Sequence, residues 1–525
     1  MSSQRLGLGA TLRTMPATFW IANTMEIFER TAWYSFFTLS TLYITGPVAE
    51  GGLGFSSEQR GFLQGVVTFF LYLFPILTGA LADRFGYKRM LFIAYSLLTP
   101  AYWLLGQFKS FGSFFFAFLL VALGAAVFKP VVISTVARVT NDRTASLGFG
   151  IFYMMVNIGG FFGPFVSSLA RTRVGWGAIF VISTVAIAMN FLVLMLYREP
   201  TTESRSAERR SLKAVLTGIV EVLGNGRLFV TVAGALLLIV MGGGMRLLPW
   251  GTIFAATGAW IALNLLYDVA LRAGGARGAT WLTAPMRFGN WRFGVYLVLL
   301  SGFWTIYNQI MNTMPEYLRD FTDSGPVLRV VERVSSFIGL SSLAAFAGNM
   351  AASGTQIPPE QIVNLDALAI IVFQVGVSWA VTRLPTFQTL MVGVLIVAVS
   401  MVLPALAGPG VGVSAWLAIA SVLVFSFGEM TTSPKSQEYV GRIAPSDKVA
   451  LYMGYYFPCI ALGNLFGGIA SGALYGWLAR DLRRPDIMWL VFAGIALVTV
   501  AALFAYDRWV LPSRSPATAP GERAA

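Results

Sequence analysis

The sequence contains about fourteen apolar runs, and most are long enough to cross a lipid bilayer as a helix. About 20 consecutive apolar residues span the hydrocarbon core as an α-helix. Such spans leave little room for charge, and only 12% of the 525 residues are charged, whereas 56% are hydrophobic. We therefore expect an all-α polytopic membrane protein. The runs occupy residues 16–45, 61–82, 90–108, 111–137, 146–169, 176–197, 228–245, 249–271, 293–317, 362–382, 386–407, 413–434, 449–478 and 486–507.

The basic residues between the runs predict how the chain is threaded. A cytoplasmic N-terminus with alternating loops places roughly two dozen Lys and Arg inside and about eleven outside. Cytoplasmic loops carry this excess in membrane proteins, so we predict cytoplasmic termini and a place in the cytoplasmic (inner) membrane. The net charge of +13 then reflects topology and not nucleic-acid binding. The first run is too long for the apolar part of a signal peptide, so we count it as a span.

The densest basic loop, with Arg198, Arg205, Arg209, Arg210 and Lys213, follows the sixth run and divides the chain. We predict an N-terminal six-helix bundle at 1–197, a basic linker with an inserted two-helix hairpin at 198–291, a C-terminal six-helix bundle at 292–510 and a disordered tail at 511–525. Two related bundles predict a substrate site between them at the midplane. Residues 319–361 form an excursion outside, with an amphipathic helix near Val327–Phe346.

The first run holds three ionisable residues, Glu26, Glu29 and Arg30. Helical spacing places them on one helix face. Charges at bilayer depth mark an ion or substrate pathway by default, although an ion pair that only locks helices together is an alternative. A fourth buried charge, Lys129, precedes Pro130 in the fourth run, and we expect Glu26 or Glu29 to be its partner. Asp268 and Glu316 are interpreted as helix-end charges.

The composition argues against an enzyme. The chain has no histidine and one cysteine, Cys459. Imidazole chemistry, disulfides and cysteine-based zinc sites are therefore excluded, and we find no nucleophile elbow or dense carboxylate metal site. We expect no cofactor and no metal, so proton transfer falls to carboxylates.

The segment after the second run, Gly79-Ala-Leu-Ala-Asp83-Arg84-Phe-Gly86-Tyr-Lys-Arg89, combines small residues with charges at helix ends. Small residues let helices approach, and such charge contacts can differ between conformations. Its whole length resembles the cytoplasmic loop motif of the major facilitator superfamily. This resemblance implies the major facilitator fold, with Gly79, Asp83, Arg84, Gly86 and Arg89 in a gating loop.

The fifth run, Phe149 to Phe161, resembles the second signature of the proton-dependent oligopeptide transporter (POT) family. Further matches are Glu26-x-x-Glu29-Arg30, Tyr34, Phe303-Trp304, Gln361-x-x-Asn364 and Gly428-Glu429 with Ser433-Pro434. The family usually has a basic residue at Phe37 and a glutamate at Asn308. With neutral residues at both positions, an ion pair between the halves and one proton site are missing here. An arginine that the family uses for the substrate carboxylate is also absent.

This resemblance implies a proton-coupled transporter that imports di- or tripeptides, or related zwitterions, through the lipid bilayer by alternating access. Glu26, Glu29, Arg30 and Lys129 would couple protons. The expected substrate contacts are Tyr34, Lys129, Tyr153, Asn157, Asn308, Asn364 and Glu429, of which Glu429 would meet an amino group. The alternative is a proton-independent or export-type transporter of another small organic solute. The sequence leaves the oligomeric state open.

Overall fold

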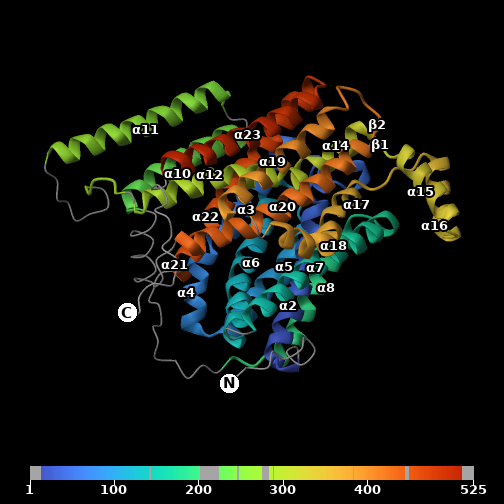
Figure 1. Cartoon of the computed structure of the whole chain (residues 1–525), viewed down its shortest axis with the longest axis horizontal. Coiled ribbons are helices and arrows are strands. Elements are labelled where there is room, and N and C mark those ends of the chain that lie inside the picture. Colours follow the sequence, from blue (N-terminus) through green and yellow to red (C-terminus); the bar gives the residue numbers. More distant parts are fainter. Residues whose placement is uncertain are drawn as a thin grey trace, which may run out of the picture.

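The computed structural model describes residues 13–140, 144–200, 224–244, 248–274, 283–287, 289–381, 384–443 and 449–510. Arg205, Arg209, Arg210, Lys213 and the tail 511–525 lie outside these residues. The regular secondary structure of the described residues is helical apart from one short strand pair (Figure 1). The first half contains α2 (Ala17–Thr45), η1 (Val48–Glu50), α3 (Ser57–Leu73), α4 (Pro75–Phe85), α5 (Tyr87–Gln107), α6 (Phe111–Val139), α7 (Ala145–Val174) and α8 (Gly177–Leu196).

The remainder of the chain begins with two helices and continues with a second large group. The two helices are α10 (Gly226–Gly244) and α11 (Trp250–Ala273). The group consists of α12 (Trp291–Tyr307), α13 (Gln309–Asn312), α14 (Met314–Phe321), β1 (Thr322–Asp323), α15 (Gly325–Phe337), α16 (Ser341–Ser353), α17 (Pro359–Val363), α18 (Leu365–Ala380), α19 (Thr386–Ala405), β2 (Val413–Ser414), α20 (Trp416–Ile443), α21 (Val449–Gly454), α22 (Phe457–Leu474), the π-helix η3 (Tyr475–Asp481) and α23 (Pro485–Trp509).

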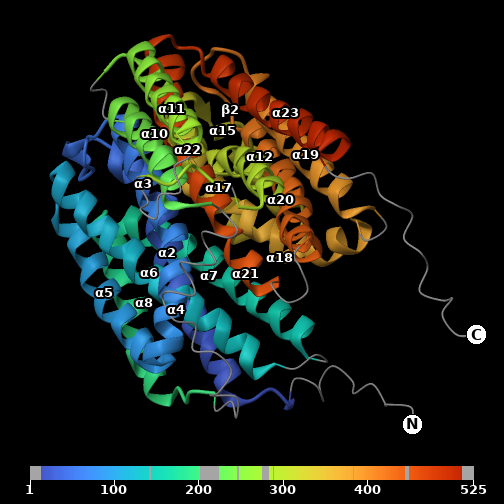
Figure 2. The same ribbon diagram turned by 90° about the vertical axis from the view of Figure 1, so that its left-hand side faces the viewer.

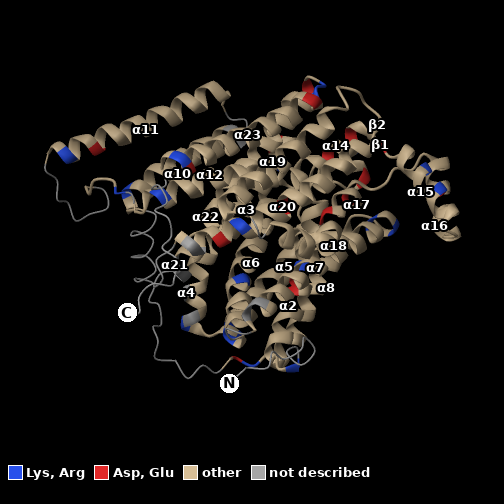
Figure 3. Ribbon diagram, in the orientation of Figure 1, with Lys and Arg blue, Asp and Glu red and all other residues tan. Residues whose placement is uncertain are grey.

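The helices follow the predicted apolar runs. Among the described residues, eleven helices are long and apolar enough to cross a membrane. Three further predicted spans are also helical but more polar or shorter: α2, α5 and α10. In Figure 3, charged residues mark only a small part of the helical ribbon. The expectation of an all-α polytopic membrane protein is therefore confirmed.

Each half of the molecule has its own hydrophobic core. The core of the first half includes Phe36, Tyr102 and Phe118, and the core of the second includes Tyr296, Trp489 and Phe492. Figure 2 shows the two halves side by side, in blue to green and in yellow to red. The halves meet closely where Gly61 and Gly65 of α3 lie against α22. A Cβ would clash with the Gly468 carbonyl oxygen at Gly61 and would lie 3.0 Å from the Leu465 carbonyl oxygen at Gly65.

The inserted hairpin packs against both halves. Val240 of α10 forms a small apolar cluster with Phe62 of α3 and Leu465 of α22. Helix α11 lies outside α10 (Figure 1). Asp268 of α11 pairs with Arg272 at 2.7 Å and accepts a hydrogen bond from the Met286 backbone N–H. Asp268 thus fastens the end of the hairpin, in agreement with its interpretation as a helix-end charge.

The excursion at 319–361 contains two helices and not one. The amphipathic helix expected near Val327–Phe346 is interrupted between α15 and α16, where Gly339 has a φ of 79°. Residues with a side chain rarely adopt this left-handed backbone conformation, so glycine ends the first helix here. Next to the excursion, β1 pairs in parallel with β2.

Candidate functional site

The three charges of the first helix lie together in the interior. Glu26, Glu29 and Arg30 are each at most 4% exposed. The Arg30 guanidinium donates from Nε to Glu29 Oε2 at 2.6 Å and lies 3.4 Å from Glu26 Oε1. Gly159 of α7 packs directly on the Arg30 backbone segment, where a Cβ would approach the Ile27 carbonyl oxygen to 2.8 Å. The small-residue patch on α7 therefore closes the cluster off from that side.

Lys129 does not form the predicted ion pair with Glu26 or Glu29 in this conformation. No ion pair within 4 Å joins Lys129 to a carboxylate among the described residues, and the Lys129 ammonium lies 4.6 Å from the centre of the Tyr72 ring instead. A cation over an aromatic face is stabilised by the ring quadrupole. Lys129 still contributes to the electrostatic surroundings of Glu26. The ammonium is thus held near the cluster without contacting it.

The proline after Lys129 is accommodated by a neighbouring helix. Pro130 lacks the N–H that would bond to the Ala126 carbonyl, four residues earlier. Thr78 of α4 replaces this donor, with its hydroxyl 2.6 Å from the Ala126 carbonyl oxygen. Lys129 therefore sits on a helix turn that is supported by the gating-loop helix.

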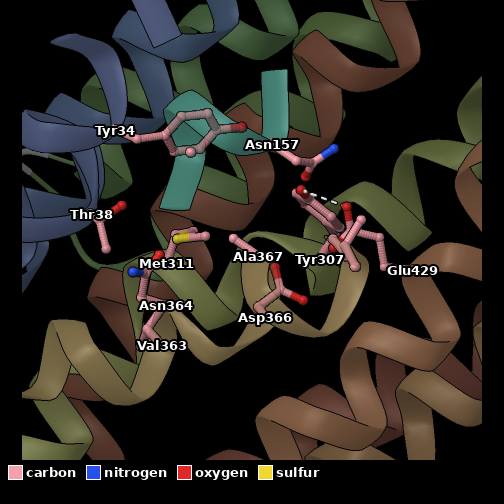
Figure 4. Close-up of a pocket in the computed structure, with 12 residues that line it drawn as sticks. Tyr34, Thr38, Asn157, Tyr307, Met311, Val363, Asn364, Asp366, Ala367 and Glu429 are labelled. Atoms are coloured by element: carbon pink, nitrogen blue, oxygen red, sulfur yellow. Dashed lines mark hydrogen bonds between the residues drawn. The ribbon is translucent and has the colours of Figure 1, made fainter. Parts of the chain in front are cut away.

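Tyr34 connects the charged cluster to a pocket between the halves. The Arg30 guanidinium lies 6.0 Å from the centre of the Tyr34 ring. Tyr34 also lines a pocket with about 400 Å³ of space not filled by protein, open solvent included (Figure 4). The full lining is Tyr34, Thr38, Asn157, Gly160, Tyr307, Met311, Val363, Asn364, Asp366, Ala367, Ile370 and Glu429.

One wall of the pocket is acidic. Glu429 of α20 accepts a hydrogen bond from the Tyr307 hydroxyl at 3.2 Å, the dashed line in Figure 4. Asp366 of α18 accepts one from the Ser426 hydroxyl at 2.6 Å. Both side chains are buried, with Glu429 6% and Asp366 4% exposed, and both line the pocket. Our sequence interpretation missed Asp366, although it lies only two residues after Asn364 and is the one charged residue of α18.

The predicted polar contacts of the pocket are partly assembled. Tyr34, Asn157, Asn364 and Glu429 line it. Asn364 donates to the Phe161 carbonyl at 2.9 Å, so it also joins the two halves. Tyr153 does not belong to the pocket lining, but it is 39% exposed, and its backbone carbonyl accepts a hydrogen bond from the Asn157 side chain at 2.9 Å.

Phe37 and Asn308 each interact within their own half. Phe37 stacks on Trp33 with ring centres 4.7 Å apart. Asn308 donates to the Trp304 carbonyl at 2.6 Å and is only 5% exposed. Asn308 is thus not among the residues that line the pocket, contrary to its expected role as a substrate contact. The Asn308 amide hydrogen-bonds to a backbone carbonyl of the adjoining helix α12.

A buried charge network joins the halves at the end where α2 stops and α3 begins, which we call the outer end. Glu316 of α14 accepts from Arg60 of α3 at 2.8 Å, and neither side chain is exposed. The Ser57 hydroxyl and Arg480 of η3 bind the other Glu316 oxygen at 2.7 and 3.0 Å. Glu316 lies in the first turn of α14, in agreement with its interpretation as a helix-end charge. Its contacts with Ser57 and Arg60 show that it also joins the two halves.

A second ion pair joins the halves near the same end. Arg171 of α7 binds Glu360 of α17 at 2.7 Å, and Ser168 donates to the same oxygen at 2.7 Å. Glu360 is fully buried. Like the Glu316 network, this pair links the two halves at the outer end of the molecule.

The gating-loop segment forms the junction of α4 and α5. Gly86 has a φ of 94°, which only glycine adopts readily, and it links the two helices. Glu199 caps the start of α5 by accepting from the Lys88 backbone N–H at 2.8 Å. Arg84 and Arg89 are exposed, and Gly79 lies beside Pro130. The side chain of Asp83 lies outside the described part of the structure.

The comparisons with known proteins agree with this architecture. The family model described as "Major Facilitator Superfamily" matches residues 31–361. The peptide transporter YePEPT of Yersinia enterocolitica is 24% identical over 506 residues, with 91% of each chain covered. The dipeptide and tripeptide permease A of Citrobacter koseri is 23% identical over 505 residues and covers 93% of this chain and 91% of its own.

Solved structures share the fold. A peptide transporter POT in complex with sulfate has a TM-score of 0.66 at 20% identity, with 96% of each chain covered. A POT family transporter in complex with 5-aminolevulinic acid has a TM-score of 0.65 at 17% identity and covers 94% of this chain and 99% of its own. The predicted major facilitator fold is confirmed. By its matched segment, its fold and its relatives, the chain belongs to the Major Facilitator Superfamily.

Proposed function

We propose that the protein is a proton-coupled secondary active transporter that imports small peptides, or related zwitterionic solutes, by alternating access. The observation that carries this proposal is the pocket between the halves, in which the Glu429 carboxyl faces the Tyr34, Asn157 and Asn364 side chains. A carboxylate suits an amino group, and the phenol and amides suit peptide groups. The relatives named as peptide transporters cover most of the chain and support the same substrate class.

The proton enters through the carboxylates of the first helix. Glu26 and Glu29 flank Arg30, and Arg30 approaches the pocket residue Tyr34. Protonation of a carboxylate removes its attraction for Arg30, so the position of the guanidinium and of Tyr34 depends on the proton. Differential stabilisation of two conformations by a proton and a solute is the physical basis of coupling.

The conformation of the structure is closed at its outer end. The pairs Arg60–Glu316 and Arg171–Glu360 both join the halves there. With both termini in the cytoplasm, this conformation is the one that faces inward. Transport then requires both pairs to separate in the outward-facing conformation.

The test is uptake into proteoliposomes that hold the purified protein. With an inward proton gradient, labelled di- and tripeptides should accumulate, and a pH-sensitive dye should record proton entry with the peptide. Protein-free liposomes and a gradient collapsed by an ionophore are the controls. A peptide library that produces neither accumulation nor proton entry would contradict the proposal.

The second candidate is proton-independent transport of a different small organic solute. Phe37 and Asn308 favour it, because both are neutral and both interact within their own half. One structural neighbour is in complex with 5-aminolevulinic acid, an amino acid and not a peptide, which supports a solute of this kind. Solute exchange at a rate that does not change with pH would favour this candidate.

A further inference from the structure

The excursion at the outer end carries an apolar surface that the proposed transport does not use. Helices α15 and α16 form a hairpin of two 13-residue helices. They pack chiefly on each other and project from the bundle beside β1 and β2 (Figure 1). Large apolar side chains of both helices are exposed: Val330, Val334, Phe337, Leu343 and Phe346. We call these five residues the apolar face. A cluster of this kind marks a surface that binds a protein or a membrane.

Helix α15 presents three different sides. Its members of the apolar face recur at spacings of four and three residues, so their side chains project together. Leu328 and Ser335 are buried and belong to the side that packs inward. Arg329 and Arg333 are exposed and four residues apart, on the remaining side next to the apolar face. An apolar side bordered by basic residues is typical of helices that lie in a membrane interface.

The base of the hairpin lies at the depth where the membrane meets water. Strand β1, which directly precedes α15, pairs with β2 through Asp323 and Ser414. Helix α20 begins just after β2 with Trp416, which is 43% exposed. Exposed tryptophans at the ends of membrane spans lie at the level of the lipid headgroups. The hairpin therefore leaves the bundle at headgroup level.

The length of the two helices excludes a membrane span. At about 1.5 Å per residue, each helix is roughly 20 Å long. This length is shorter than the hydrocarbon core, which is about 30 Å thick. Phe337, which is 91% exposed, shows that the apolar face is not covered by the rest of the chain either. A short helix with such a face buries it by lying flat in the interface.

We propose that the hairpin of α15 and α16 is a membrane anchor, whose apolar face inserts into the outer leaflet of the bilayer. Arg329 and Arg333 then lie at the level of the lipid phosphates, which arginine binds with two hydrogen bonds. The flanking helices α14 and α17 carry Glu316 and Glu360, the carboxylates that join the halves. The anchor thus ties the outer end of the second half to lipid, whatever solute the protein carries.

Spin labels on the full-length protein in lipid nanodiscs test the anchor. Cys459 is the only cysteine, so the labels are attached in a Cys459→Ser background. A label at Val334→Cys lies on the apolar face, and a label at Ser336→Cys lies on the arginine side. Oxygen, which concentrates in lipid, should relax the label at position 334 more than a water-soluble nickel complex does, and the order should be reversed at position 336.

Two results of this measurement would overturn the anchor. Equal access of the nickel complex to both positions would show that the apolar face lies in water. A label at position 334 that neither reagent reaches would show that protein covers the face, as in an interface with a second copy of the chain.

A matched pair of variants tests whether the apolar face holds the hairpin in the lipid. With the label at Leu343→Cys, Phe337→Glu should lower the ratio of inserted to free hairpin at least about tenfold, because it removes a large buried apolar side chain. Ser336→Glu adds the same charge one residue earlier, on the arginine side, and should leave the label in lipid. Melting curves in detergent check that each variant folds. An equal response of the label to both variants would contradict the anchor.

Discussion

Single buried polar residues carry most of the chemistry in this molecule. Glu26, Glu29 and Arg30 form ion pairs within one helix. With all three side chains ionised, the cluster carries one net negative charge. A buried charge that loses its partner is costly, by about 3–5 kcal/mol. Their mutual contacts therefore make the cluster sensitive to each proton that enters it. Lys129, over the Tyr72 ring, is a nearby cation that can add to the balance.

Replacement of Glu29 by glutamine should uncouple transport from protons. The amide cannot take up a proton, so proton-driven peptide uptake should fall at least about tenfold, which corresponds to ~1.4 kcal/mol of lost driving interaction. Counterflow of peptide needs no net proton movement and should stay measurable. Uptake and counterflow in proteoliposomes provide the measurement. Glu50→Gln, at an exposed position of η1, is the control. Equal loss of both activities would argue against a proton role.

The hydrogen bond from Thr78 to the Ala126 carbonyl should stabilise the fold. Thr78→Val removes the donor that replaces the missing N–H of Pro130, and we expect a loss of about 1 kcal/mol, seen as a lower melting temperature in detergent. In a Pro130→Ala background the new N–H can bond to that carbonyl, so the same change should cost less. Thr172→Val, at an exposed position, is the control. Equal costs in both backgrounds would contradict this explanation.

Helix pairs in this protein approach closely where glycines replace side chains. On α7, Gly159 lies against the Arg30 segment of α2, while Gly150 on the same helix faces open space. Van der Waals contact between small residues drives helix association in lipid. The glycine at position 159 therefore has a packing role, whereas the glycine at position 150 has none. The close contact of α2 and α7 brings Tyr34 beside Gly160, at the edge of the pocket.

The two glycines of α7 permit a matched comparison. Gly159→Leu must displace α2 and should cost about 1–3 kcal/mol or more through overpacking, with little folded protein recovered. Gly150→Leu adds the same side chain where nothing lies within 4 Å and should be tolerated. Size-exclusion profiles and melting temperatures in detergent are the measurements. Similar behaviour of both variants would show that the close approach of α2 and α7 is not required.

At the scale of the whole molecule, the two halves are held together mainly by charge at the outer end and by small residues at α3 and α22. Arg60, Glu316 and Arg480 are drawn from three different helices. In Figure 3, several acidic residues lie along the ribbon near α14. A network of this kind can separate as a unit, which suits a conformational change between rigid halves.

Loss of Glu316 should open the outer end. Glu316→Gln leaves Arg60 buried without a carboxylate, at a cost of about 3–5 kcal/mol to the closed conformation. A cysteine placed at Thr45 in a Cys459→Ser background should then react faster with a membrane-impermeant maleimide. The double variant Arg60→Met with Glu316→Met removes both charges and should restore part of the protection. Unchanged labelling in Glu316→Gln would show that the network does not hold the end closed.

The sequence by itself determined the class of fold and the candidate charges. Run length, charge placement and the resemblance of two motifs indicated a helical membrane protein of two bundles and a hairpin, because these signals are local and repeat along the chain. It also pointed to Glu26, Glu29, Arg30, Tyr34, Asn157, Asn364 and Glu429.

Only the tertiary structure decided which of these residues meet. Asp366 and Glu429, 63 residues apart, line one pocket, and Arg60 and Glu316, 256 residues apart, form an ion pair. No local pattern predicts such neighbours. In the packed structure, Asn308 lies outside the pocket lining, and the Lys129 ammonium lies over the Tyr72 ring and forms no ion pair with a described carboxylate. The sequence identifies which charged residues lie in apolar spans, whereas the partner of each charge depends on how the helices pack.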